Sequence, residues 1–230
     1  MKDYSKRTYE SGNLLRRYAQ RTRFSKALQL VKENSTGSVH LLDVGTGDGF
    51  FLQEIEPVVK GDFIGLEPYM EPLENVRNKI LGSWPDINNY VVAHGKFDIV
   101  TSFEVFEHLN AQLQSETLQQ IANVLKKNGV VIISVPIELS FPSLIKNIFR
   151  KISAGKNDDY YTWKRIWKSI WGKPIPECRQ EAYLSHMGFY YTDLEKIFQE
   201  RYKIENKFYS PLPYLGYNFN SQVFYVLKKL

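Results

Sequence analysis

Between residues 39 and 136, short continuous apolar runs alternate with longer segments in which apolar residues recur every three or four positions. Continuous apolar runs bounded by turn residues are typical of buried strands, and the longer period is typical of amphipathic helices. The pattern predicts strands at 39–44, 62–66, 97–103 and 130–135 and helices at 50–58, 69–81 and 111–126. Strands that alternate with helices indicate an α/β fold in which helices cover both faces of a parallel sheet.

The pattern differs at the two ends of this core. Before it, apolar positions at helical spacing predict an amphipathic helix at 13–33. After it, Thr192 and Glu195 have the spacing of a capping box, which predicts that a helix begins there. The last two apolar runs, 203–209 and 222–227, have no helical segment between them. We therefore expect these two strands to pair antiparallel.

Composition narrows the class of protein. The chain has 230 residues, of which 43% are hydrophobic and 24% are charged, as in a globular domain. No apolar run approaches the roughly 18–20 residues that a membrane span needs, and the first residues are charged and lack the apolar stretch of a secretory signal. The single cysteine, Cys178, cannot form an internal disulfide. We therefore expect a one-domain protein in a reducing compartment, the cytoplasm.

The formal charge of +5 is unevenly distributed. Residues 1–34 hold nine Lys or Arg against three Asp or Glu, and residues 141–173 hold eight against two, so each segment has a net charge of +6 and the remaining body is acidic. Such segments are either solvated helix faces or surfaces that attract an anion. The anion could be a membrane surface, a phosphate-bearing substrate or nucleic acid.

The motif with the clearest chemistry is DVGTGDG at 43–49, which follows a predicted strand and precedes a predicted helix. Glycines allow a tight turn and a close approach of the backbone to a ligand. The carboxylate of Asp43 would repel a pyrophosphate and suits a ligand that carries an ammonium group. Glu67 follows the second predicted strand, where a carboxylate can accept hydrogen bonds from both hydroxyls of a ribose.

The motifs DVGTGDG, GLEP, FDIVTSFEVFEHL and LKKNGVVIISVP together resemble those of the class I S-adenosylmethionine-dependent methyltransferases. The resemblance implies a Rossmann-like, mostly parallel sheet of seven strands with an antiparallel C-terminal strand. It implies S-adenosylmethionine as cofactor and S-adenosylhomocysteine as product. The cofactor-binding residues would be Asp43, Gly45, Thr46, Gly47, Gly49, Glu67, Pro68, Ser102, Phe103 and Glu104. Among these, the glycine loop and Asp43 would hold the methionyl part, Glu67 the ribose, and Ser102 and Phe103 the sulfonium side.

The third strand of the family pattern is hard to find in this sequence. The candidate at 90–93 is separated from the next strand by three residues, too few for a parallel crossover. We therefore expect a truncated third strand or a loop at 83–89 in its place. Because no acid follows 90–93, we expect backbone groups to hold adenine, with Pro68, Tyr69 and His94 nearby.

Glu104, Glu107 and His108 form an ExxEH pattern whose members would share one face of a helical turn. Two carboxylates and an imidazole make a candidate site for a divalent metal. The pattern is similar to that of the ubiquinone-pathway O-methyltransferases and the small-RNA 2′-O-methyltransferases, where the resemblance implies Mg²⁺. His186 could add a ligand. There are two alternatives to a metal site. The pattern can be the structural start of a helix, which we expect rather than a metal site, or His108 or His186 can act as a general base in catalysis.

The segment 141–173 carries apolar residues at helical spacing, including Trp163, Trp167 and Trp171, with Lys and Arg beside them. It predicts a helical insertion after the fifth strand. Three roles are open for the insertion. It covers the core or contacts a second copy in a homodimer, it contacts a membrane surface peripherally, or it forms a lid over the acceptor. The expected organisation is one domain, 1–230, with an N-terminal helical segment (1–36), a cofactor-binding core (37–136), the insertion (137–182) and a C-terminal helix and strand pair (183–230).

These features predict an S-adenosylmethionine-dependent methyltransferase that O-methylates a small-molecule, glycan or lipid-linked acceptor. One alternative is an RNA or other nucleic-acid methyltransferase, favoured by the basic segments and the ExxEH pattern. Nucleic acid is not the expected partner, because an isoelectric point near 9.0 is weak evidence without an accompanying RNA-binding motif. A second alternative is a non-catalytic scaffold that binds the cofactor.

Overall fold

The computed structural model describes residues 14–69, 78–138, 163–164, 168 and 189–230. In these ranges, seven strands form a single sheet with the order β3-β2-β1-β4-β5-β7-β6. The strands are β1 (Val39–Val44), β2 (Gly61–Leu66), β3 (Lys79–Leu81), β4 (Phe97–Phe103), β5 (Leu125–Pro136), β6 (Tyr202–Ser210) and β7 (Gln222–Lys229). β7 is antiparallel to both of its neighbours, whereas β1 to β5 pair in parallel. The predicted seven-stranded, mostly parallel sheet is confirmed.

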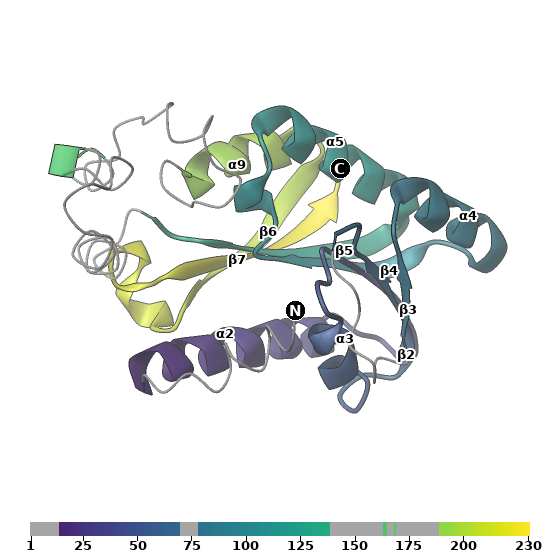
Figure 1. Ribbon diagram of the computed structural model, residues 1–230, viewed down its shortest axis with the longest axis horizontal. Helices are drawn as coiled ribbons and strands as arrows, with labels where there is room; N and C mark the ends of the chain where they lie inside the picture. The colour runs from purple at the N-terminus through teal and green to yellow at the C-terminus, as the bar shows by residue number, and fades with distance from the viewer. Residues whose placement is uncertain (1–13, 70–77, 139–162, 165–167, 169–188) are drawn as a thin grey trace.

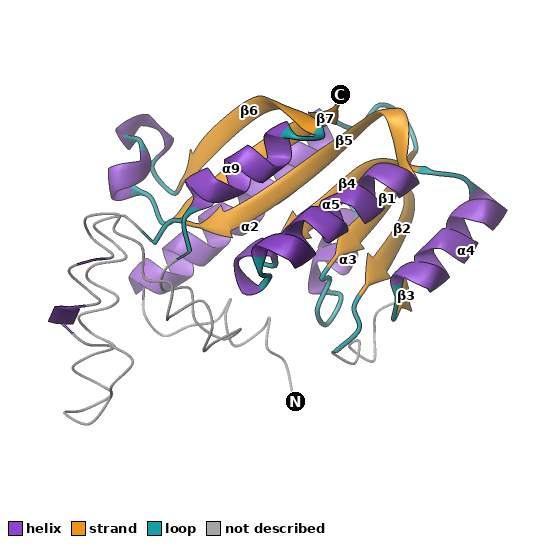
Figure 2. Ribbon diagram, turned by 90° about the horizontal axis from the view of Figure 1, so that it is seen from above, coloured by secondary structure: helices purple, strands orange, loops and turns teal. Residues whose placement is uncertain are grey.

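Helices cover both faces of this sheet (Figure 1). The helices α2 (Leu14–Glu33) and α3 (Phe50–Ile55) lie on one face. The helices α4 (Trp84–His94), α5 (Ala111–Val124) and α9 (Tyr191–Gln199) lie on the other (Figure 2). Three short 3-10 helices complete the described elements, η1 (Phe106–His108), η2 (Pro213–Leu215) and η3 (Tyr217–Phe219).

Two buried apolar clusters lie on opposite faces of the sheet, and β5 shows how the sequence produces both. Val131, Ile133 and Val135 belong to the cluster under α4, α5 and α9. Val130 and Ile132 belong to the cluster under α2 and α3. Successive side chains of a strand point to opposite faces, so a continuous apolar run is needed where both faces are covered.

The region before β4 differs from the sequence prediction. Residues 90–93, the candidate third strand, lie in α4, as do most of the residues of the alternative loop at 83–89, and the end of the predicted helix 69–81 forms β3. The side chain of Ser83 caps α4 by accepting a hydrogen bond from the backbone N–H of Asp86, and Pro85 occupies its first turn. These start signals outweigh the strand propensity of the Tyr-Val-Val run. The third strand is short, as predicted, with three residues.

The expected capping box before α9 is also wrong. The N-cap of this helix is Tyr190, and no side chain caps it. Glu195 instead accepts a hydrogen bond from the hydroxyl of Tyr225 at 2.7 Å and pairs with Lys207. The side chain that the local motif predicted as a cap therefore binds a tertiary partner on β7 instead.

Most of the predicted insertion lies outside the described residues, so its helices and its division from the core stay predictions. Trp163, which belongs to it, is exposed. Among the described helices, none combines the length and the apolar character required to cross a membrane.

Candidate functional site

The candidate site lies at the carboxyl edge of the parallel strands, where the loops after β1, β2 and β4 meet. In open α/β sheets, ligands bind outside the carboxyl ends of the strands. β1 lies between β2 and β4, with Asp43 opposite Gly65 on one side and Thr101 on the other. From β1 the chain passes to β2 and β3 on one side, whereas β4 lies on the other side of β1. The strand order therefore reverses at β1, and this edge contains the reversal point.

The loop after β1 depends on three glycines. Gly45, Gly47 and Gly49 have φ values of 75°, 58° and 83°, in the left-handed region that other residues rarely adopt. The backbone N–H of Gly45 donates to the carbonyl of Leu66 at 2.8 Å, which fixes the loop to the end of β2. Gly49 is also the N-cap of α3. This conformation exposes backbone to a ligand without side chains in between.

Asp43 is buried just before this loop, with 3% of its surface exposed. Its Oδ1 accepts a hydrogen bond from the hydroxyl of Thr101 at 2.7 Å. Burial raises the pKa of Asp43 to about 6, although the hydrogen bonds from Thr101 and Thr46 oppose this shift. A buried carboxylate with a raised pKa gains most from a cationic ligand, which would stabilise the charged form.

Glu67, directly after β2, holds the glycine loop from the other side. Its Oε2 accepts from the backbone N–H of Gly47 at 3.0 Å, and its Oε1 accepts from that of Tyr69 at 2.9 Å. Each carboxylate oxygen has a second lone pair, so Glu67 can accept further hydrogen bonds from a diol. Pro68, which follows it, is exposed.

The end of β4 contributes two side chains that pack inward. Ser102 is fully buried and donates from its hydroxyl to the carbonyl of Val44 at 3.0 Å. Phe103 is half-buried, and its ring lies 4.9 Å from that of Phe51 in an edge-to-face arrangement. These two residues therefore join β4 to β1 and α3 beside the glycine loop.

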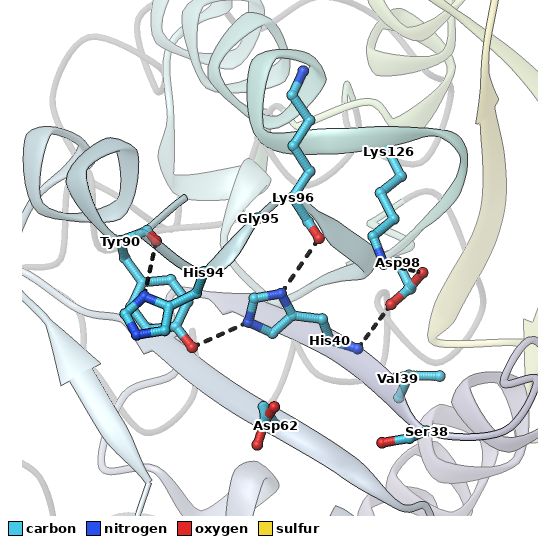
Figure 3. A pocket seen from close by; sticks show the side chains of 10 residues that line it. All are labelled: Ser38, Val39, His40, Asp62, Tyr90, His94, Gly95, Lys96, Asp98 and Lys126. Carbon is cyan, nitrogen blue, oxygen red and sulfur yellow. Dashed lines mark hydrogen bonds and ion pairs between the residues drawn. The ribbon is translucent and has the colours of Figure 1, made fainter. Parts of the chain in front are cut away.

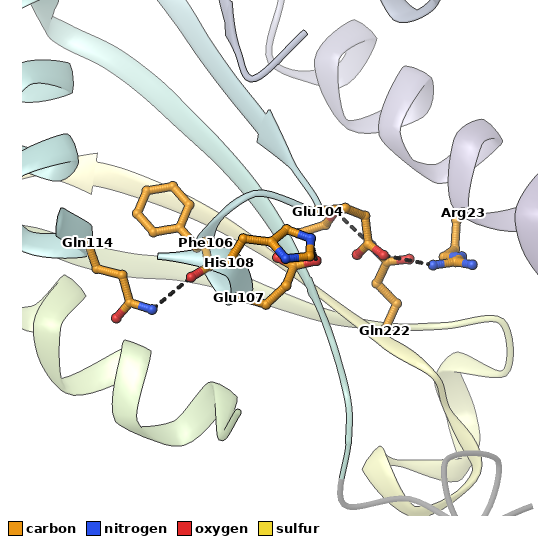
Figure 4. A network of polar contacts seen from close by, with 8 residues as sticks. Arg23, Glu104, Phe106, Glu107, His108, Gln114 and Gln222 are labelled. Atoms are coloured by element: carbon orange, nitrogen blue, oxygen red, sulfur yellow. Dashed lines mark hydrogen bonds and ion pairs between the residues drawn. The ribbon is translucent and has the colours of Figure 1, made fainter. Parts of the chain in front are cut away.

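Glu104 is the centre of a polar network at the same edge (Figure 4). It has a φ of 58°, an uncommon value for a residue with a side chain. Its Oε2 lies 3.1 Å from Nη1 of Arg23 on α2, and its Oε1 accepts from the amide of Gln222 on β7 at 2.6 Å. The network joins the N-terminal helix, β4 and the last strand of the chain.

The other two residues of the ExxEH pattern both lie in η1. Glu107 is buried, and burial together with the charge of Glu104 raises its pKa well above the usual range. His108 is partly exposed, and its Nε2 lies 3.9 Å from Oε1 of Glu107. Gln114 fixes this segment by donating to the carbonyl of Phe106 at 2.8 Å.

These three residues do not form a metal centre in the described part of the chain. No group of three His, Cys, Asp or Glu there has an arrangement that could hold a metal ion. Glu104 is directed to Arg23 and Gln222 instead. His186, the fourth candidate ligand and second candidate base, lies outside the described residues.

A sequence family described as a methyltransferase domain matches residues 15–201 of the chain. The chain belongs to this methyltransferase family. The methyltransferase is S-adenosylmethionine-dependent and of the EC 2.1.1 class, and its fold is the class I Rossmann-like fold that the sequence predicted. No curated protein matches the sequence closely enough to be counted as a relative.

Solved structures with the same fold are distant in sequence. A protein from Pyrococcus horikoshii OT3 is 13% identical, with a TM-score of 0.60 over 97% of this chain and 96% of its own. Magnesium protoporphyrin IX methyltransferase from Synechocystis, solved with bound S-adenosylhomocysteine, is 12% identical, with a TM-score of 0.56 over 96% and 90%. The plantazolicin methyltransferase BpumL, also in complex with S-adenosylhomocysteine, is 16% identical, with a TM-score of 0.53 over 100% and 92%. At these identities the likeness shows the fold alone.

The methyltransferase also has a pocket of about 340 Å³ at the opposite, amino edge of the sheet (Figure 3). It contains His94, whose Nδ1 lies 3.1 Å from the carbonyl of Tyr90, and His40, whose Nε2 lies 3.1 Å from the hydroxyl of Tyr90. The expectation that His94 lies near adenine is therefore wrong, because α4 carries it away from the carboxyl edge. This pocket contains no residue of the glycine loop, so we assign the functional site to the carboxyl edge.

Sequence reasoning missed two groups of residues at the carboxyl edge of the methyltransferase. Arg23 and Gln222 contact Glu104 across 81 and 118 positions of the chain, and no local pattern encodes such contacts. Ser83 and Asp86 follow β3, whose Leu81 carbonyl accepts from the backbone N–H of Glu67 at 2.9 Å. Here a signal was present, because a Ser followed two residues later by Pro is typical of a helix start at the end of a strand.

Proposed function

We propose that this methyltransferase binds S-adenosylmethionine at the carboxyl edge of β1 and β2 and methylates an oxygen of a small-molecule, glycan or lipid-linked acceptor. The observation that carries the cofactor assignment is the buried carboxylate of Asp43 beside a loop of three left-handed glycines. A cationic amino-acid group fits this carboxylate, and a ribose fits the carboxylate of Glu67. These two carboxylates therefore suit the two polar parts of the cofactor.

The other cofactor-binding residues take roles consistent with their positions. Gly45, Thr46, Gly47 and Gly49 would present backbone to the methionyl part, and Pro68 would flank the ribose. Ser102, Phe103 and Glu104, at and after the end of β4, would lie on the sulfonium side. Ser83 and Asp86 are our candidates for the adenine amine, because β3 ends beside Glu67.

When bound, S-adenosylmethionine would supply an activated methyl group, which the acceptor oxygen would take as the methyl carbon–sulfur bond breaks and sulfur keeps that electron pair. The task of the protein is to position the acceptor oxygen in line and to take its proton. We assign the role of the base that accepts this proton to His108, which is partly exposed next to this edge. Glu107 lies beside the imidazole and would position it. His186 remains a second candidate base.

Two experiments test the proposal in sequence. Isothermal titration should show that S-adenosylhomocysteine binds the wild-type protein and binds Asp43→Ala much more weakly, with the exposed Glu54→Ala as a matched control. Cell extract should then be incubated with cofactor labelled with tritium in its methyl group, with and without the enzyme. Label is expected in the aqueous small-molecule or organic-solvent fraction.

Other outcomes identify the alternatives. Enzyme-dependent label that nuclease releases would favour nucleic-acid methylation, which the basic segments motivate. Binding of S-adenosylhomocysteine without any enzyme-dependent label in every fraction would favour the non-catalytic scaffold. Absence of binding at millimolar ligand would overturn the cofactor site itself.

A further inference from the structure

The turn between β6 and β7 exposes an unusual number of large side chains. Five large apolar side chains are exposed within eight consecutive residues, and Tyr214 is 98% exposed. They are Leu212, Tyr214, Leu215, Tyr217 and Phe219. No residue from 210 to 220 carries a charge. Single exposed apolar residues are ordinary, but a contiguous group of them indicates an interaction surface.

The turn is held in this conformation by a fully buried side chain. The amide of Asn220 accepts from the backbone N–H of Leu212 at 2.6 Å and donates to the carbonyl of Leu212 at 2.7 Å. It also donates to the carbonyl of Gly216. The exposed side chains are thus presented on a fixed backbone, and a partner that binds them orders little additional chain.

Several positive charges lie at this end of the molecule. Figure 1 shows the yellow turn and the dark purple beginning of α2 at the same end. The first part of α2, residues 14–26, contains five Lys or Arg and no acid. Among these residues, Arg21 is exposed, as is the neighbouring ring of Tyr18.

We propose that the turn 211–220 docks on the surface of an anionic lipid bilayer, with the basic beginning of α2 next to the lipid phosphates. Leu and Phe side chains bury in the boundary between headgroups and acyl chains, and Tyr rings prefer the same depth because their hydroxyls reach water. Lys and Arg near an anionic surface add electrostatic attraction. A turn without any charge of its own, with cations at the same end of the molecule, fits this boundary better than the polar rim of a protein interface.

The proposed surface differs from the insertion 141–173, for which the sequence also suggested a membrane contact. The turn follows β6, whose last residue, Ser210, pairs with Gln222, the residue that binds Glu104. Docking would therefore place the carboxyl edge toward the bilayer. The docking itself goes beyond the proposed methyl transfer and is measurable without cofactor, so failure of one leaves the other standing.

The test is sedimentation of the full chain with vesicles at low salt, without cofactor. Vesicles of phosphatidylcholine and phosphatidylglycerol in equal parts are compared with vesicles of phosphatidylcholine alone. We expect binding to the anionic vesicles, weakened by added salt. The double variant Tyr214→Ser/Leu215→Ser should lower the partition coefficient by about tenfold or more, since it removes two apolar side chains from the interface. Val92→Ser, at an equally exposed site on α4, is the matched control and should bind like the wild type.

A second variant and two supporting measurements keep the result interpretable. Arg17→Gln/Arg21→Gln should lose the preference for anionic vesicles and keep the weak apolar binding. Circular dichroism and thermal unfolding should show that every variant is folded. No binding of the wild type to anionic vesicles, or equal binding by Tyr214→Ser/Leu215→Ser, would overturn the proposal. It would also be overturned by a wild-type dimer that the same double variant converts to a monomer, because a second copy would then cover the turn.

Discussion

Gly45 of the glycine loop lies so close to Val105 that a Cβ atom on Gly45 would overlap Cγ2 of Val105. Gly45 follows β1, and Val105 precedes η1 in the segment that also carries Glu104. The glycine loop and the segment that carries Glu104 are therefore packed against each other.

This contact predicts that Gly45→Ala is strongly destabilising. The substitution adds an overlap with Val105 and places a side chain at a φ of 75°, so we expect a loss of about 2–4 kcal/mol in the free energy of unfolding. Urea denaturation measures it. Gly82→Ala is the control, because nothing lies within 4 Å of a Cβ at that position, and it should change stability by less than about 0.5 kcal/mol. Similar losses in the two variants would contradict the packing argument.

The raised pKa of Asp43 predicts that Asp43→Asn stabilises the protein at neutral pH. A carboxyl whose folded pKa is about 6 and whose unfolded pKa is near 3.8 holds its proton more tightly in the folded state. The stability that this tighter proton binding contributes is therefore lost as pH rises from 4 to 6, and the loss amounts to up to about 3 kcal/mol. Asn removes this cost and can still accept from Thr101. The difference in unfolding free energy between variant and wild type should be largest at pH 7.5 and disappear near pH 4.

The same group should make cofactor binding dependent on pH, if Asp43 receives the cationic part of the cofactor as proposed. At pH 5 only about one-tenth of a carboxyl with a pKa near 6 is ionised, so the affinity for S-adenosylhomocysteine should fall about tenfold between pH 7 and pH 5. Isothermal titration at several pH values checks it. Asp43→Asn should bind weakly throughout, without this dependence. A wild-type affinity that is constant over the range would exclude Asp43 as the partner of the cation.

Elements whose local sequence signals agree with one another are the ones that the sequence predicts correctly. The strands at 39–44, 97–103 and 222–227 carry dense apolar runs, and all three are present as β1, β4 and β7. The run at 90–93 is equally apolar but lies in α4, because the cap at Ser83 and the packing of a helix there override its strand propensity. A short apolar run therefore identifies a strand only when the signals in the residues around it also favour a strand.

The candidate site shows the same division. Asp43 and the glycines are neighbours in one motif, so their proximity was predictable, and the order of the strands brought Glu67 to them. The contacts of Arg23 and Gln222 with Glu104 depend on the placement of α2 and β7, which is set by packing over the whole sheet. Sequence patterns thus predicted the contacts around the glycine loop better than the long-range contacts of Glu104.

Glu67 is expected to support both the loop and the ligand. Glu67→Ala removes the acceptor of two backbone N–H groups, so it should cost about 1–2 kcal/mol of stability and lower the affinity for S-adenosylhomocysteine by about tenfold or more. Glu67→Gln keeps one acceptor oxygen and should have an intermediate effect. Thermal unfolding and isothermal titration separate the two effects. An unchanged affinity in Glu67→Ala would remove this residue from the ribose site.

The pair of Arg23 and Glu104 should contribute little to stability. Their side chains are 21% and 38% exposed, and such pairs are worth about 0.2–1 kcal/mol. A double-mutant cycle with Arg23→Met and Glu104→Gln should give a coupling energy in this range. The affinity for S-adenosylhomocysteine should change less than in Glu67→Ala. A coupling above about 2 kcal/mol would mean that the pair is more desolvated than its exposure indicates.

The ExxEH residues predict a weak response to divalent metals. The oxygens of Glu104 accept from Arg23 and Gln222, and the raised pKa of Glu107 favours its protonated form, which is a poor ligand. Adding Mg²⁺ or Mn²⁺ to the wild-type protein should therefore leave the midpoint of thermal unfolding unchanged within about 1 °C, and activity should resist chelators. The control is the same titration on Glu104→Gln and His186→Ala. A stabilisation of several degrees in the wild type that both variants lose would show that Arg23 gives way to a metal ion and that the ExxEH pattern binds it.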